Sequence, residues 1–255
     1  MTFSLALSQI IVILIAGFVG EFIGVFIGGG GFFIQPAMLA SNIPPHITVA
    51  NDVSAALGAT LVSAWVFHKK GKVDYKMLKP WIPGLTLGAI VGVFILSQTQ
   101  SEFLKIFIIA VSVLGALYIA FKKETSEIKI KSISINPIIP SLVISFGFSA
   151  YIGFSGLGSG IIATLFLMLL YGRNIKEGMA FKEIIHVIPF AVAFIYYGLL
   201  GYLHWPILIP LILVNALAGY AGAHLAIALP EKFLKVIFLG GIMCFVAVLI
   251  LNYIP

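Results

Sequence analysis

The feature that most constrains this chain is a series of apolar runs, each roughly 17 to 22 residues long, separated by short polar stretches. A helix of that length crosses about 30 Å of hydrocarbon. Because lipid cannot hydrogen-bond to the backbone, such runs must be helical where they cross it. Only 9% of the 255 residues are charged, against about 25% in soluble domains. The sequence therefore predicts an all-α polytopic membrane protein.

The remaining charges give a net charge of +6. A basic balance can indicate nucleic-acid binding, but in a membrane protein it more often reflects lysine-rich cytoplasmic loops. We therefore expect the chain to meet a lipid bilayer, in the cytoplasmic membrane, and no nucleic acid. Its single cysteine, Cys244, lies in an apolar run, so no disulfide can form within the chain.

The two halves of the chain match each other without gaps at one constant offset, which we call the repeat register. The matches include Gly17 with Gly147, Gly28 with Gly158, Gly30 with Gly160, Ala50 with Ala180, Pro80 with Pro210, Gly92 with Gly222, and Phe103–Lys105 with Phe233–Lys235. One register that holds over half the chain predicts a duplicated unit. We assign residues 1–121 to a first transmembrane repeat, 122–136 to a cytoplasmic linker and 137–255 to a second repeat.

Each repeat is predicted to contain a first segment, a short piece beyond a glycine-rich break, and three spanning helices. In the first repeat these lie near Ser8–Ile27, Gly31–Ala40, Ala50–His68, Trp81–Leu96 and Phe103–Phe121. In the second they lie near Ile138–Phe154, Ile161–Tyr171, Ala180–Leu199, Pro206–Leu229 and Val236–Tyr253. The short pieces cannot span alone, because a helix rises only about 1.5 Å per residue. Re-entrant hairpins and tilted spans are both left open.

The basic residues indicate how the second repeat is oriented. If each broken segment returns to its starting side, 14 of the 15 Lys and Arg residues share one side and only Lys105 lies opposite. If it makes a single crossing, the split is nine against six. The excess of basic residues in cytoplasmic loops favours the first arrangement. It predicts inverted repeats with both termini outside.

Two glycine clusters interrupt the apolar runs at equivalent points of the repeats, "GGGG" at Gly28–Gly31 and "GLGSG" at Gly156–Gly160. Inverted repeats with paired broken helices are typical of secondary transporters, whose substrates bind near the bilayer midplane. Backbone N–H groups freed at Gly29–Gly31 and at Gly158, Ser159 and Gly160 suit an anion. Glycine stripes such as Gly20, Gly24 and Gly28, or Gly84, Gly88 and Gly92, instead indicate close helix packing.

Ionisable residues within apolar runs are costly and usually functional. Asp52 and Lys182 occupy equivalent positions in the two repeats. Lys182 could pair with an anion or extend to the interface, and Asp52 could carry a proton or stabilise a helix N-terminus. Glu21 could carry a coupled proton or bond a neighbouring helix. His186, one turn after Lys182, is a third candidate for proton coupling.

The sequence gives little support for an enzyme, and we expect neither catalytic residues nor a cofactor. His46, His186, His204 and His224 lack the spacing of zinc ligands, so no metal site is expected. There is no phosphate-binding GxxxxGK[ST] motif, and no strand precedes "FSGLGSG" to form a nucleophile elbow. Trp81, Tyr197 and other aromatic residues near helix ends are expected to anchor the interface.

The chain resembles the TauE/SafE sulfite exporter family of bacterial and archaeal permeases. The resemblance covers nearly the whole chain. It rests on "GFVGEFIGVFIGGGGFFIQPAMLA" and "ITVANDVSAALGATLVSAWVFHKKGKVDY" in the first half, and on "GFSAYIGFSGLGSG", "GMAFKEI", "LLGYLHWPI" and "LAGYAGAHLA" in the second. It implies a duplicated bundle that moves sulfite, thiosulfate or small organic anions.

The resemblance also implies site residues. The family's first glycine-rich turn matches Gly28, Gly30 and Gly31, and its copy matches Gly158 and Gly160. The region after the first turn matches Ala50 and Asn51, and its basic counterpart matches Lys182. Asp52 stands where many members carry a basic or neutral residue, and Ser159 interrupts the second glycine run, so the resemblance singles out no particular anion.

We therefore predict a secondary transporter of a small sulfur-containing anion, coupled to protons, that works by alternating access. One alternative is a carrier for another small anion, a nutrient or a metal cation, in which case carboxylates would face the ligand. Another is a membrane subunit without transport activity, whose glycine stripes dock partner helices. A homodimer is also left open by the sequence.

Overall fold

The apolar runs form helices, and the glycine clusters form the breaks between them. The computed structural model describes residues 5–70, 78–121, 138–160, 162–163 and 175–230. Within these residues every regular element is an α-helix: α1 (Leu7–Ile27), α2 (Gly31–Ala40), α3 (Pro45–Lys69), α4 (Ile82–Gln98), α5 (Ser101–Phe121), α6 (Ile138–Phe154), α8 (Ile175–Leu199) and α9 (Trp205–Ala228). The all-α fold class is therefore confirmed.

The observed bounds follow the predicted ones, except at the starts of α3 and α8. Helices α2 and α6 have the predicted limits, whereas α3 begins at Pro45, ahead of the predicted Ala50, and α8 begins at Ile175, ahead of the predicted Ala180. Proline at the first helical position is pre-organised for a helix start, and "PP" at Pro44–Pro45 sets that start here. The predicted linker and the segment Val236–Tyr253 lie outside the described residues, as does nearly all of Ile161–Tyr171.

Four of the described helices are long and apolar enough to cross a membrane: Leu7–Phe26, Pro45–Lys69, Glu177–Leu199 and Trp205–Ala228. Large apolar side chains cover their outer faces and those of their neighbours, among them Ile15, Leu87, Phe94, Ile195, Leu213 and Leu217, each more than half exposed. A soluble protein would not expose apolar surface on this scale. These faces suit contact with lipid, which supports a membrane-embedded protein.

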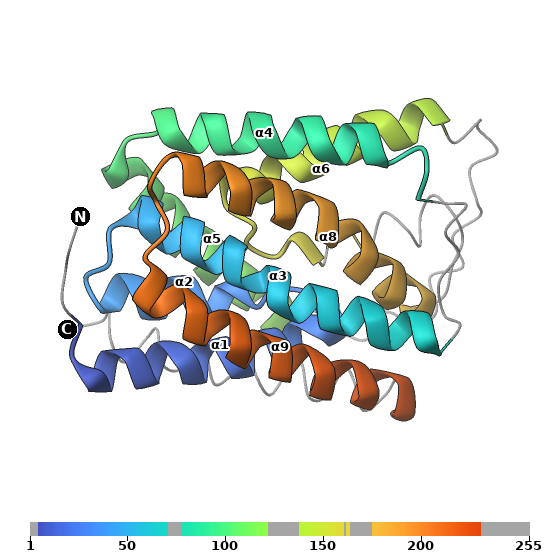
Figure 1. Cartoon of the computed structure of the whole chain (residues 1–255), viewed down its shortest axis with the longest axis horizontal. Helices are drawn as coiled ribbons and strands as arrows, with labels where there is room; N and C mark the ends of the chain where they lie inside the picture. Colours follow the sequence, from blue (N-terminus) through green and yellow to red (C-terminus); the bar gives the residue numbers. More distant parts are fainter. Residues whose placement is uncertain (1–4, 71–77, 122–137, 161, 164–174, 231–255) are drawn as a thin grey trace.

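The long helices form two groups that run in opposite directions (Figure 1). Helices α1, α3 and α9 make one group, in which Gly219 of α9 lies against Ala59 of α3, and Gly222 lies against Phe22 of α1. Helices α4, α6 and α8 make the other group. The groups meet where α3 packs against α8, and there the start of α3 lies beside the end of α8.

Each group combines helices from both halves of the chain. Helix α4 packs on α6 and α8, which follow it in the second half, and α9 packs on α1 and α3 of the first half. In the repeat register, α1 corresponds to α6, α3 to α8, and α4 to α9. The two members of each pair run in opposite directions (Figure 1), as inverted repeats require. The duplication and its orientation in the membrane stay predictions.

The glycine stripe of α4 packs against the backbone of α6. A Cβ on Gly84, Gly88 or Gly92 would overlap the carbonyl oxygen of Leu142, Phe146 or Ala150, respectively. This is the close helix contact that the spacing predicts. The stripe of α1 behaves differently: Gly20 and Gly24 lie against Gly30, so they support the break that follows α1.

Valine at Gly88 is expected to lower the free energy of unfolding by about 1–3 kcal/mol or more, because two helix backbones would have to separate. Thermal unfolding of the purified protein in detergent measures this effect. Gly198→Ala is the matched control, since a Cβ on Gly198 would meet only Leu203 Cδ1, at an ordinary 3.5 Å. Equal stability of the two variants would contradict the assigned α4–α6 contact.

Two aromatic residues expected at the membrane interface are instead buried. Trp81 and Tyr197 are both fully buried. The ring of Trp81 packs edge-on against Phe181, and the hydroxyl of Tyr197 donates to the carbonyl oxygen of Gly153. The prediction for these two residues was wrong, because position near a helix end does not reveal which face of the helix is covered by a neighbour.

Candidate functional site

The two chain breaks touch each other in the interior of the bundle. Helix α1 ends at Ile27, and Gly28 and Gly29 then adopt φ values of 84° and 128°, which only glycine tolerates readily. The break after α6 contains Gly156 and Gly158 with φ values of 70° and 66°. A Cβ on Gly160 would lie 2.5 Å from Gly28 Cα, so the two breaks are in backbone contact.

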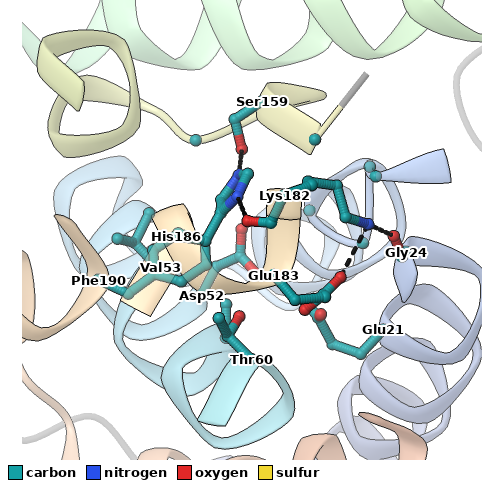
Figure 2. Close-up of a pocket in the computed structure, with 17 residues that line it drawn as sticks. Glu21, Gly24, Asp52, Val53, Thr60, Ser159, Lys182, Glu183, His186 and Phe190 are labelled. Carbon is teal, nitrogen blue, oxygen red and sulfur yellow. Dashed lines mark hydrogen bonds and ion pairs between the residues drawn. The ribbon is translucent and has the colours of Figure 1, made fainter. Parts of the chain in front are cut away.

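A cavity of about 50 Å³ lies at this meeting point, which is more than the space that one water molecule needs. Its walls come from α1, α3, α8 and both breaks (Figure 2). The polar and glycine residues that line it are Glu21, Gly24, Gly28, Gly29, Gly30, Gly31, Asp52, Thr60, Gly156, Ser159, Gly160, Lys182, Glu183 and His186. Most of the residues predicted for the site are among them.

Lys182 binds the end of helix α1. Its Nζ donates to the carbonyl oxygens of Gly24, at 2.6 Å, and Val25, at 3.0 Å, and it forms an ion pair with Glu183 Oε1 at 2.8 Å. The carbonyl oxygen of Gly24 also accepts the N–H of Gly28 at 2.6 Å, and carbonyls in the last turn of a helix carry partial negative charge. The ammonium therefore stabilises the broken end of α1, with all three of its hydrogens engaged.

Glu183 completes this arrangement from α8. Its Oε2 accepts a hydrogen bond of 2.5 Å from the hydroxyl of Ser63 on α3. Glu183 is only 5% exposed, and a buried carboxylate needs such partners. Glu183 was not among the residues predicted for the site. An acidic residue directly after a lysine inside an apolar run was the signal that could have identified it.

Glu21 and Asp52 lie beside the start of helix α2. A Cβ on Gly30 would lie 2.5 Å from Glu21 Oε1, and a Cβ on Gly31 would lie 2.7 Å from Asp52 Oδ2. Asp52 Oδ2 also accepts a hydrogen bond of 2.7 Å from Gln35 Nε2. Negative charge is stabilised at a helix N-terminus, so both carboxylates occupy the part of the site where a bound anion would be stabilised.

The backbone N–H groups of Gly29, Gly30 and Gly31 are bound by no acceptor within the described part of the chain. These residues line the cavity, and Gly30, at the N-cap position of α2, offers no side-chain cap. Free N–H groups at a helix N-terminus form a ready site for an oxyanion. The first break therefore has the N–H donors that binding of an anion requires.

His186 connects the second break to α8. Its Nδ1 lies 2.7 Å from the carbonyl oxygen of Lys182, which can only accept, so Nδ1 carries a hydrogen. In the neutral ring Nε2 is then an acceptor, and it receives the hydroxyl hydrogen of Ser159 at 3.0 Å (Figure 2). Both nitrogens of His186 are engaged, which leaves Glu21 and Asp52 as the groups better placed to take up a proton.

Asn51 and Gly158 lie outside the cavity wall. The amide of Asn51 donates to the carbonyl oxygens of Ile47 and Tyr202, and its Oδ1 accepts from the backbone N–H of His204. Asn51 therefore fixes the start of α3 to the loop between α8 and α9. A Cβ on Gly158 would lie 2.8 Å from the ring of Phe32. Neither residue lines the cavity, and their assignment to substrate binding stays a prediction.

Comparison with known proteins finds one matching family and several similar membrane proteins. The family described as "Sulfite exporter TauE/SafE" matches residues 12–249. A "Probable membrane transporter protein" from Haemophilus influenzae is 22% identical over 221 residues, which cover 87% of this chain and 86% of the relative. "Probable membrane transporter protein ORF9" from a Sinorhizobium species is 24% identical over 231 residues, covering 91% and 88%. No solved structure matches the chain.

Proposed function

The chain belongs to the TauE/SafE sulfite exporter family, and on this premise we propose that it carries a small sulfur-containing anion across the membrane. Its family and its relatives, which are named membrane transporter proteins, identify it as a membrane transporter of the TauE/SafE type. The proposed substrates are sulfite, thiosulfate or an organosulfonate. Transport of this kind needs neither a covalent step nor a cofactor, and we assign the protein no enzymatic activity.

The observation that carries this proposal is the row of N–H groups at Gly29–Gly31, which have no acceptor among the described residues and lie in the cavity where two broken helices meet. Three adjacent donors can bind the oxygens of a tetrahedral or pyramidal oxyanion. Ser159 and Gly160 form the opposite part of the wall. We assign Gly28–Gly31 and Gly160 to the substrate-binding wall, whereas Ser159 donates its N–H to Gly156 and its hydroxyl hydrogen to His186. Lys182 acts by holding the end of α1 in place.

The charge of the cavity supports coupling to a cation. Its described walls contain three carboxylates, from Glu21, Asp52 and Glu183, and one ammonium, from Lys182. An anion at Gly29–Gly31 would lie against Glu21 and Asp52, and that repulsion is strong in a medium of low dielectric constant. Protonation of Glu21 would remove part of it. We therefore propose that proton uptake by Glu21 and anion binding favour each other.

We propose that movement of one helix group against the other opens the cavity to each side in turn. The α3–α8 contact, which joins the two groups, would be the surface that shifts, as in other transporters built from inverted repeats. The lysine distribution supports placement in the cytoplasmic membrane with both termini outside. In this arrangement the 122–136 linker faces the cytoplasm.

Sulfite uptake into proteoliposomes that contain the purified protein tests the proposal. We expect saturable flux that an imposed pH gradient accelerates, and no comparable flux in protein-free liposomes. Glu21→Gln is expected to retain flux but lose most of its response to the pH gradient. Folded protein that gives no flux of sulfite, thiosulfate or a sulfonate would contradict the proposed substrate class.

The surplus of carboxylates favours one second candidate, a carrier whose substrate is itself a cation. In that case Glu21→Gln and Asp52→Asn would abolish binding, whereas Lys182→Ala would retain it in protein that folds. Flux of a cation without any anion, measured in the same proteoliposomes, would favour this candidate over an anion carrier.

A further inference from the structure

Beside the cavity, where α2, α3 and the end of α6 come together, the side chain of Gln35 joins the side chain of Asp52 to the main chain of Ser155. Gln35 Nε2 donates to Asp52 Oδ2 and to the carbonyl oxygen of Ser155, with both distances 2.7 Å. Because both partners of this nitrogen are acceptors, the orientation of the Gln35 amide is fixed. The three residues are almost fully buried, with Asp52 4% exposed and Gln35 and Ser155 0%.

Each of these residues keeps one buried oxygen without a partner among the described residues: Gln35 Oε1, Asp52 Oδ1 and Ser155 Oγ. Buried polar atoms are nearly always paired, and exceptions call for an explanation such as a bound ion. Two of the three, the amide oxygen and the carboxylate oxygen, can only accept. What is missing at this point is therefore positive charge or a donor.

The other repeat contains the missing charge. In the repeat register, Val25 corresponds to Ser155, and Lys182 corresponds to Asp52. The carbonyl oxygen of Val25 receives the Lys182 ammonium at 3.0 Å. The carbonyl oxygen of Ser155 receives only the neutral amide of Gln35, backed by the Asp52 carboxylate. A built-in cation thus satisfies the end of α1, whereas the end of α6 faces an acid.

We propose that Asp52, Gln35 and Ser155 bind a sodium ion at the end of helix α6. The donors are all oxygens and include one carboxylate, which suits a hard monovalent cation better than a transition metal. The C-terminal end of a broken helix contributes partial negative charge, and transporters bind coupling ions at such ends. The sodium ion would take the role that the Lys182 ammonium has in the other repeat.

The effect of sodium on transport rests on the proposed function, because it assumes that an anion binds at Gly29–Gly31. Asp52 Oδ2 lies beside Gly31, the first residue of α2. A cation bound to Asp52 would offset its repulsion of an anion at Gly29–Gly31. Sodium and the anion would then bind cooperatively, and each would raise the affinity for the other by the same factor. Sodium at Asp52 would act beside a proton on Glu21.

Thermal unfolding in detergent, with sodium exchanged for potassium or choline at constant ionic strength, tests the site directly. For wild-type protein we expect Tm to rise with sodium by about 5 °C at saturation, and to stay unchanged in potassium or choline. Asp52→Asn and Ser155→Ala are expected to lose this response. Ser54→Ala is the matched control, because Ser54 carries an equally buried hydroxyl on α3 that has no partner in the described part of the chain and does not line the cavity.

The change of Tm with sodium and the flux of sulfite are two separate measurements, so the sodium site and the proposed function can fail independently. An equal response to potassium or choline would overturn the inference, as would a full sodium response in both Asp52→Asn and Ser155→Ala. If sulfite flux occurs but sodium neither stabilises the protein nor raises the flux, the inference fails and the proposed function stands. If sodium stabilises the protein but no anion is transported, the site stands and the proposed function fails.

Discussion

Alanine in place of Gly160 is expected to reduce sulfite flux by about fivefold to a hundredfold or more. The added Cβ would lie 2.5 Å from Gly28 Cα and 2.9 Å from Lys182 Cδ. The first of these atoms belongs to the backbone of the other break and cannot rotate away, so the two breaks must separate. Overpacking of this kind costs about 1–3 kcal/mol, and each step of about 1.4 kcal/mol corresponds to about a factor of ten.

Gly147→Ala provides the matched control for this variant. Gly147 lies in α6, and a Cβ there would meet no atom within 4 Å. Alanine is the better helix former, so Gly147→Ala should have wild-type flux and equal or higher stability. Flux through both variants is measured in proteoliposomes at equal protein density, with Tm measured in parallel. Wild-type flux through Gly160→Ala would show that the contact between the breaks is dispensable.

Replacing Lys182 with methionine is expected to lower the free energy of unfolding by about 3–5 kcal/mol, because it leaves a buried charge without its partner. Lys182→Met removes the counter-ion of Glu183 and the donor to Gly24 and Val25. The Lys182 side chain is only 3% exposed, so bulk solvent does not screen the charge that its removal would leave on Glu183. Chemical unfolding in detergent measures the loss, and the α1–α8 contact should open first.

A double variant distinguishes loss of charge from loss of packing. Lys182→Met with Glu183→Gln removes both charges and should recover part of the stability that the single variant loses. Lys105→Met, which removes an exposed lysine, should change stability by less than about 0.5 kcal/mol. If Lys182→Met were as stable as Lys105→Met, the ammonium could not be what holds the end of α1.

Much of the fold could be predicted because lipid restricts what a backbone can do. Runs of apolar residues had to become helices, and four consecutive glycines had to interrupt one, which is why the limits of α2 agree with the prediction. The start of α3 was missed because the apolar pattern begins at Ala50, whereas two prolines set the helix start earlier. Helix bounds depend on local chemistry as well as on hydrophobicity.

The residues that line the cavity were easier to predict than the contacts that those residues make. Ionisable residues in apolar runs identified Glu21, Asp52, Lys182 and His186, all of which line the cavity. Two partners of Lys182, by contrast, lie 157 and 158 residues away in the chain and are main-chain atoms, so no side-chain pattern reveals them. Asn51 shows the opposite case, since its polarity serves the loop after α8 rather than the cavity.

The exchange of α4 and α9 between the two helix groups fixes the order in which the protein can be assembled during synthesis. When α4 enters the membrane, its glycine stripe has no helix to pack against, because α6 and α8 are synthesised later. Helices α1 and α3 likewise lack their contact with α9 until α9 has been synthesised. The contacts that α1, α3 and α4 make with the second half are therefore complete only once α9 has been synthesised.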